Sequence, residues 1–242
     1  MRELIYLNVR EDYHKWYSPI LGRDFEMLVF GHGGIPVVLF PTSQGRYFEA
    51  KDRGLIDCAS WFLENGYFKI YCPDSIDSLS WYNKGAAPWV RPANHSLYDQ
   101  LIKEDVLGRA FYETGNYRAV MAGCSFGGYH AANFAFRHPD MVQAMLSMSG
   151  IFDMRDQLDG YYDDNVFYNN PVDYLPNDND PNLWNMKIAL GTGEWDICLG
   201  YNQQLSEILD RKNISHWLDV APNEKHDWPV WLRQFPKYLS LI

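Results

Sequence analysis

Residues 123–127, Gly-Cys-Ser-Phe-Gly, place a glycine two positions before and two positions after a serine. This spacing is typical of a strand that turns sharply into a helix and holds a strained serine hydroxyl at the tip of the turn. A side chain at either glycine would collide across such a turn. We therefore expect Ser125 to be a nucleophile that reacts covalently with its substrate.

The residues on either side of this motif support the same geometry. Residues 117–122 are mostly apolar and end at a glycine, as a buried parallel strand would, whereas residues 129–136 favour a helix that stops near a His-Pro pair. Cys124 is the alternative nucleophile, but it lacks the paired glycines. We expect it to pack beneath the sheet.

An activated serine needs a histidine base and an acid that orients the histidine, and in folds of this kind the acid and then the histidine follow the serine along the chain. Residues 186–196 read as a strand that runs into a glycine-rich loop with two carboxylates. Asp196 is the preferred acid. Glu194 remains an alternative because both lie on one short loop.

His226 lies in the polar loop 222–229, after the last expected strand and before the last helix, which is the expected place for the base. Its neighbour Asp227 can seldom fold back onto the adjacent ring, so we expect it to serve the loop. The remaining histidines are expected to be structural or solvated: His14, His32, His95, His130, His138 and His216.

A tetrahedral intermediate needs hydrogen-bond donors aimed at its oxyanion. One should be the backbone amide of Phe126, directly after the nucleophile. The second should come from the loop 41–45, which follows an apolar strand. The Ser43 amide is the preferred donor and Thr42 is the next choice.

Strand and helix patterns alternate along the chain, which predicts an α/β fold with a mostly parallel sheet covered by helices on both faces. In such a sheet, functional residues collect at the carboxyl ends of the strands. The expected strands are residues 4–9 and 26–30, which could form an antiparallel edge, and residues 36–40, 67–72, 117–122, 142–148, 186–190 and 215–220. The expected helices cover residues 56–63, 96 or 97 to about 115, 129–136, 201–210 and 229–239.

Composition limits the class of protein. The 242 residues fit one domain spanning 1–242, and 47% hydrophobic residues suffice for a substantial core. A net charge of −10 disfavours nucleic acid and anionic membranes as partners. No stretch is long enough to span a membrane, and residues 1–12 lack the pattern of a secretory signal. A cytoplasmic protein is the default expectation, although a mature secreted chain would look the same. A homo-oligomer is compatible with the sequence.

Two further features concern cysteines and acidic residues. The cysteines are widely spaced and are expected to be reduced and structural rather than a zinc site or disulfide framework: Cys58, Cys72, Cys124 and Cys198. Aspartates and aromatic residues are interleaved within residues 151–185, which indicates either a solvated surface excursion or an acidic lid over the site. Such a lid would favour neutral or cationic substrates over phosphorylated ones.

The chain resembles the α/β-hydrolase superfamily, specifically the esterase D-like branch with S-formylglutathione hydrolases, feruloyl and enterobactin esterases, and mycolyltransferases. The resemblance covers nearly the whole chain and rests on residues 123–128, 193–196 and 225–228, with a smaller likeness at 16–23. It implies an α/β-hydrolase fold and a serine hydrolase without metal or organic cofactor, in which Ser125, His226 and Asp196 form the triad. One departure is Pro41-Thr42, where many relatives have His-Gly.

The leading interpretation is a carboxylesterase that acts on a small-molecule ester through an acyl-enzyme. Its pocket is expected to include Trp81, Tyr82 and Trp89, and the aromatic content of 16% is compatible with aryl or sugar-linked esters. An acyltransferase would use the same acyl-enzyme, since an alcohol competes with water at one site. A non-catalytic ligand-binding relative is the alternative from another class, although all three triad candidates are present.

Overall fold

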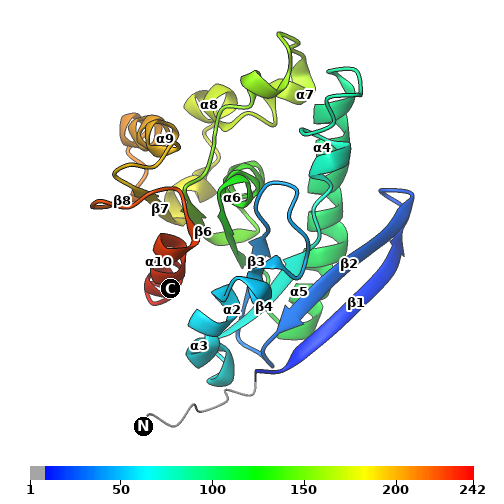
Figure 1. Ribbon diagram of the computed structural model, residues 1–242, viewed down its shortest axis with the longest axis vertical. Helices are drawn as coiled ribbons and strands as arrows, with labels where there is room; N and C mark the ends of the chain where they lie inside the picture. Colours follow the sequence, from blue (N-terminus) through cyan, green and yellow to red (C-terminus); the bar gives the residue numbers. More distant parts are fainter. Residues whose placement is uncertain (1–8) are drawn as a thin grey trace.

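A single eight-stranded sheet forms the centre of the computed structural model, which describes residues 9–242 (Figure 1). The strand order is β1-β2-β4-β3-β5-β6-β7-β8. The strands are β1 Glu11–Ser18, β2 Arg23–Phe30, β3 Ile35–Phe40, β4 Phe68–Pro73, β5 Ala119–Cys124, β6 Val142–Met148, β7 Lys187–Gly193 and β8 Trp217–Ala221.

Most of this sheet is parallel, as predicted. Only the β1–β2 and β2–β4 pairs are antiparallel, while the pairs from β4–β3 through to β7–β8 are all parallel. The carboxyl ends of β3, β5, β6, β7 and β8 therefore open onto the same edge of the sheet, where the predicted site residues follow them.

The antiparallel edge differs from the sequence expectation. The strand predicted at 4–9 lies almost wholly outside the described residues, and the outermost strand is β1, Glu11–Ser18. Its side chains mostly alternate between exposed and half-buried. Many of its residues are polar or charged, so the sequence contains no apolar run that would predict a strand here. An edge strand of this kind has one face in water, which is why polarity did not prevent it from forming.

Helices cover both faces of the sheet (Figure 1). α4, α5, α6 and α9 pack on one face and α1, α2, α3 and α10 on the other, and neighbouring strand residues such as Val37 and Val38 point into opposite layers. The helices are α1 Glu49–Asp52, α2 Leu55–Cys58, α3 Ser60–Glu64, α4 Val90–Leu101, α5 Gly108–Thr114, α6 Phe126–Arg137, α7 Asp164–Phe167, α8 Pro171–Tyr174, α9 Leu199–Arg211 and α10 Trp228–Leu239. In residues 9–242, none of them combines the length and apolar character that a bilayer crossing requires.

α4 begins at Val90, several residues before the expected start at Ser96 or Leu97. Pro92 obscured this start in the sequence, but a proline in the first turn of a helix removes no hydrogen bond. A π-helical stretch, Ile102–Leu107, joins α4 to α5. The preceding loop is correspondingly shorter and contains a 3₁₀ turn at Asp77–Leu79.

The segment 151–185 forms α7, α8 and 3₁₀ turns at Arg155–Gln157, Leu175–Asn177 and Pro181–Asn185. It is attached to α4 in part through Arg91, whose side chain is buried. The Arg91 guanidinium donates to the Gln157 carbonyl at 2.6 Å and to Asp159 Oδ2 at 2.8 Å. Hydrogen bonds thus connect the beginning of the segment to α4.

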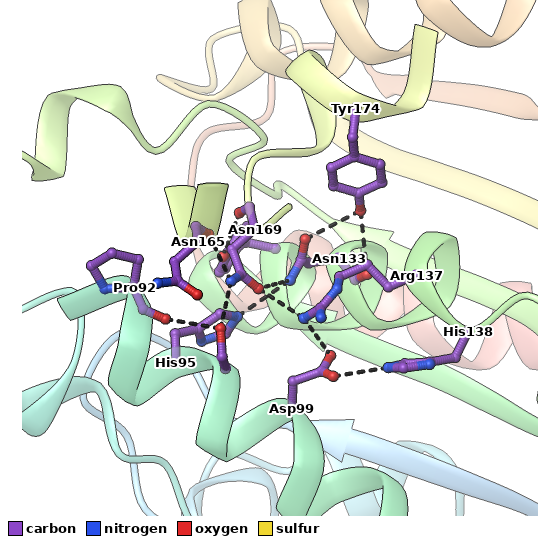
Figure 2. A network of polar contacts seen from close by, with 11 residues as sticks. Pro92, His95, Asp99, Asn133, Arg137, His138, Asn165, Asn169 and Tyr174 are labelled. Carbon is purple, nitrogen blue, oxygen red and sulfur yellow. Dashed lines mark hydrogen bonds and ion pairs between the residues drawn. The ribbon is translucent and has the colours of Figure 1, made fainter. Parts of the chain in front are cut away.

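A buried polar network fastens it again further along (Figure 2). Asn169 lies at the centre, where its Oδ1 accepts from Asn133 Nδ2 at 3.1 Å and from an Arg137 nitrogen at 2.9 Å, while its Nδ2 donates to Ser96 Oγ at 3.0 Å. Asn133 and Arg137 belong to α6 and Ser96 to α4. Asn169 therefore connects segment 151–185 to α4 and α6, which lie on the same face of the sheet.

Replacement of this asparagine tests the anchoring. Because Asn169→Ala leaves several buried polar partners unsatisfied, we expect the free energy of unfolding to fall by about 2–4 kcal/mol. Asn179→Ala, an exposed asparagine of the same segment, is the control and should change it by less than about 0.5 kcal/mol. Urea unfolding measures both, and equal values would show that the network does not stabilise the fold.

Candidate active site

Ser125 lies at the turn between β5 and α6. Its backbone has φ 54° and ψ −122°, a conformation that is strained for a residue with a side chain. The Ser125 amide donates to the Met148 carbonyl of β6 at 2.7 Å, and its own carbonyl accepts from the Gly128 amide at 2.9 Å. Hydrogen bonds on both sides thus hold the hydroxyl at the tip of the turn.

The two glycines of the motif are required by close backbone approaches. A Cβ at Gly123 would collide with the backbone of Gly127. A Cβ at Gly127 would lie 2.5 Å from the Phe40 carbonyl oxygen and 2.6 Å from that of Pro41. The first turn of α6 therefore rests directly on the end of β3, which brings the loop 41–45 next to the serine.

His226 lies within hydrogen-bond distance of both Ser125 and Asp196. Its Nε2 is 2.9 Å from Ser125 Oγ and its Nδ1 is 2.8 Å from Asp196 Oδ1. With the ring proton on Nδ1, the histidine donates to the carboxylate and accepts from the serine hydroxyl. This orientation is the one in which a histidine can take the serine proton.

Two further protein groups donate hydrogen bonds to the Asp196 carboxylate. Oδ1 also accepts from the Cys198 amide at 2.7 Å, and Oδ2 accepts from Ser149 Oγ, which in turn accepts from Trp231 Nε1 at 2.8 Å. Burial acts to raise the pKa of Asp196, but the hydrogen bonds from His226, Ser149 and the Cys198 amide outweigh burial and lower it. Asp196 is therefore a carboxylate at neutral pH.

Glu194, the alternative acid, lies elsewhere on the same loop. It is exposed, and among the described residues its side chain accepts a hydrogen bond from the Asn223 amide at 2.9 Å. That contact braces the loop that carries the histidine against the loop that carries Asp196. The carboxylate that reaches His226 is Asp196.

The loop before α10 positions the histidine. Asp227 is the N-cap of α10 and its Oδ1 accepts from the Trp228 amide at 2.8 Å, so it serves the loop. The Trp231 ring packs edge-on against the His226 ring with centroids 5.0 Å apart. The other histidines lie against partners of their own: Arg109 for His14, the Glu64 carbonyl for His32, Asn133 for His95, Asp77 for His130, Asp99 for His138 and Ser206 for His216.

Two backbone amides are candidate donors for an oxyanion site. Phe126 is the first residue of α6. Neither its amide nor the Ser43 amide has a hydrogen-bond partner within residues 9–242. The choice of Thr42 is contradicted, because its amide donates to Glu49 Oε2 at 2.8 Å and is no longer available to an oxyanion. Ser43 and Phe126 are the donors that remain.

The three aromatic residues expected in the pocket have different surroundings. Trp81 is fully buried and packs against Tyr129 with centroids 6.1 Å apart, so it belongs to the core and was wrongly assigned to a pocket wall. Tyr82 is half-buried, donates its hydroxyl proton to Ser43 Oγ at 2.8 Å and packs edge-on against Phe126. Trp89 is exposed and stands beside Tyr161. Of the three, Tyr82 touches residues of the candidate oxyanion site.

Sequence reasoning missed Ser149 and Trp231. Ser149 follows β6 with φ 59°, and its amide donates to the Gly191 carbonyl at 2.7 Å, which turns the hydroxyl toward Asp196. A Ser-Gly pair directly after a buried strand next to the nucleophile strand was the available signal. Trp231 gave none, because a tryptophan on an amphipathic helix is ordinarily a core residue.

Asp196, Cys198 and His226 also form the one group of metal-ligand types found within residues 9–242, with their ligand atoms within 4.8 Å of one another. Both carboxylate oxygens and His226 Nδ1 already make hydrogen bonds, and burial raises the pKa of Cys198 to about 12. A metal would have to displace these contacts and deprotonate the thiol. The arrangement fits proton transfer better than metal binding.

Comparisons with known proteins find similarity in structure but not in sequence. No protein-family model and no curated protein sequence matches the chain. A ferulic acid esterase superposes with a TM-score of 0.79 at 17% identity, covering 96% of this chain and 97% of that one. Two further neighbours are a substrate-bound fluorophosphonate-binding serine hydrolase from Staphylococcus aureus, with TM-score 0.76, 15% identity and coverage of 96% and 98%, and an S-formylglutathione hydrolase from Agrobacterium tumefaciens, with TM-score 0.75, 13% identity and coverage of 97% and 95%. The chain therefore has the α/β-hydrolase fold of these enzymes, as expected.

Separate substitutions of Asp196 and Glu194 test which of the two carboxylates orients His226. Asp196→Asn should lower kcat by about 10⁴-fold, because the amide cannot hold the imidazole in the required tautomer. Glu194→Gln should change kcat about twofold or less, since its side chain is exposed. Steady-state hydrolysis of an activated ester measures both, and the opposite ranking would make Glu194 the acid.

The cysteines provide a second test. Burial raises the pKa of Cys58 and Cys198 to about 12 and the pKa values of Cys72 and Cys124 above the ordinary range. At pH 8 only about one thiol in 10⁴ of pKa 12 is ionised, and the thiolate is the reactive form. Iodoacetamide should therefore leave the native protein unmodified and active at pH 8, while alkylating all four cysteines in denaturant. Rapid inactivation of the native protein would indicate a reactive cysteine at the site.

Proposed function

We propose that this protein is a serine hydrolase that cleaves carboxylic esters through an acyl-enzyme on Ser125. The observation that carries the proposal is the continuous hydrogen-bond chain from Ser125 Oγ through His226 to Asp196, at a strained turn. The Phe126 and Ser43 amides support it, since neither has a hydrogen-bond partner in the described part of the chain. A buried structural histidine would need neither the strained serine nor the free donors.

In the first half of the reaction, His226 Nε2 takes the proton of the Ser125 hydroxyl as Oγ attacks the ester carbonyl carbon. The negative charge that develops on the carbonyl oxygen is stabilised by the Phe126 and Ser43 amides. The tetrahedral intermediate collapses, the bond to the leaving oxygen breaks, and His226 gives its proton to the departing alcohol. Asp196 stabilises the imidazolium during these steps.

In the second half, a water molecule replaces the alcohol. His226 Nε2 takes a proton from the water, the hydroxide oxygen attacks the acyl carbon, and the same two amides again stabilise the oxyanion. Collapse breaks the bond to Ser125 Oγ, which recovers its proton from His226, and the carboxylic acid leaves.

Acidic residues near α9 favour uncharged esters over phosphorylated ones. Burial raises the pKa of Tyr201 in the first turn of α9, and the negative charges of Asp156 and Asp153 raise it further, so these two carboxylates lie near the start of α9. Of the two, Asp153 forms an ion pair with Arg155. A phosphorylated substrate would be repelled there.

Labelling with a fluorophosphonate tests the proposal most directly. The wild-type chain should gain a single adduct by intact mass and lose its activity on 4-nitrophenyl acetate, because an activated serine displaces fluoride from phosphorus. Ser125→Ala should gain no adduct and lose activity by several orders of magnitude. Hydrolysis of methyl ferulate and of S-formylglutathione should also be measured, because two structural neighbours are named as a ferulic acid esterase and an S-formylglutathione hydrolase.

Circular dichroism shows whether Ser125→Ala is folded, and the exposed, distant Ser240→Ala serves as the matched control that should label like wild type. A folded wild-type protein that neither labels nor hydrolyses any ester would overturn the proposal and favour a ligand-binding function for the same site.

A further inference from the structure

The backbone amides of Thr42, Ser43 and Gln44, in the loop 41–45, differ in their hydrogen bonding. The Thr42 amide donates to Glu49 Oε2 at 2.8 Å, and the Gln44 amide donates to Asp77 Oδ2 at 2.9 Å. The Ser43 amide, between them, has no partner in the described part of the chain. Two carboxylates thus occupy the flanking donors, while the middle donor has no partner among residues 9–242.

The contact on the Thr42 side is made at two points. Glu49 Oε1 accepts the Thr42 hydroxyl proton at 2.8 Å while Oε2 accepts from its amide, so the carboxylate binds both donors of one residue. A Cβ at Gly45 would lie 2.7 Å from Glu49 Oε2 and 2.9 Å from Pro41 Cβ. Because Gly45 has no side chain, the Glu49 carboxylate of α1 has space to contact Thr42.

The contact on the Gln44 side connects the loop to the helix of the nucleophile. Asp77 is fully buried, and its Oδ1 lies 2.9 Å from Nε2 of His130, a buried residue of α6. Burying a carboxylate costs free energy unless hydrogen-bond donors satisfy its oxygens. The donors to the Asp77 carboxylate are the His130 ring and the Gln44 backbone amide. Gln44 itself has φ 55°, a left-handed conformation that the hydrogen bond to Asp77 holds in place.

We infer that Glu49 and Asp77 are positioning residues of the oxyanion site: they fix the amides on either side of Ser43 so that the Ser43 amide stays aimed at the reacting carbonyl. Neither carboxylate touches the substrate. The inference rests on the proposed esterase function, in which the Ser43 and Phe126 amides stabilise the oxyanion.

The chemistry of glutamine provides a conservative variant. Glu49→Gln keeps one acceptor for the Thr42 amide and offers an NH₂ group to the Thr42 hydroxyl, which can accept instead of donate. Glu49→Ala removes both contacts and frees the Thr42 amide. Asp52→Ala, an exposed carboxylate of the same helix, is the matched control.

We expect Glu49→Ala to lower kcat for 4-nitrophenyl acetate by about 10- to 100-fold with KM changed less than about threefold, because a misplaced donor weakens binding of the transition state and not of the ester. The inhibition constant of a trifluoromethyl ketone, which forms a tetrahedral adduct with the serine, should rise by the same factor. Glu49→Gln should recover most of both losses, and Asp52→Ala should match wild type. Asp77→Ala should behave like Glu49→Ala if it folds.

The outcomes separate the two proposals. If wild type hydrolyses no ester and takes no fluorophosphonate, the esterase function itself fails. If wild type is active but folded Glu49→Ala keeps wild-type kcat and ketone affinity, the positioning role fails alone. Equal losses in Glu49→Ala and Glu49→Gln would also contradict it, since the conservative variant preserves the contacts. Where Asp77→Ala does not fold, the Glu49 pair decides.

Discussion

The close packing of the first turn of α6 on the end of β3 is the constraint on which the site depends. Gly127 lies against the Phe40 and Pro41 carbonyls with no room for a side chain, and Gly123 lies against Gly127 in the same way. This contact determines where Ser125 stands and brings the loop 41–45 beside it. The two candidate oxyanion donors come from different segments of the chain, and the distance between them is set by backbone packing rather than by flexible side chains.

Buried or half-buried carboxylates hold the remaining groups, and each one is satisfied by specific donors. Asp196 accepts from His226, the Cys198 amide and Ser149, while Asp77 accepts from His130 and the Gln44 amide. The cost of taking each charge out of water is offset only when all its donors are in position. Such a carboxylate therefore stabilises one arrangement of its neighbours and penalises the others, which is the property that a site for proton transfer needs.

The sequence was sufficient for the fold class, the strand-turn-helix around Ser125 and the loops that carry Asp196 and His226, because glycine spacing and apolar runs report local geometry directly. It failed where tertiary contacts decide the outcome. β1 is polar because one of its faces is in water, Trp81 is buried because α6 and segment 151–185 cover it, and the Thr42 amide is occupied by a glutamate seven residues further on. Ser149 and Trp231 act through Asp196, and no spacing rule connects residues 47 and 82 positions apart.

β8 is the last strand of the sheet and pairs only with β7, and its residues are exposed or half-buried. The loop that carries His226 directly follows this strand, whereas Ser125 follows β5, a central strand of the sheet. An edge strand with few buried residues opens at a lower free-energy cost than the centre of a sheet, and opening here would separate the histidine from the serine. We therefore expect heat to disrupt the histidine loop before it unfolds the rest of the sheet.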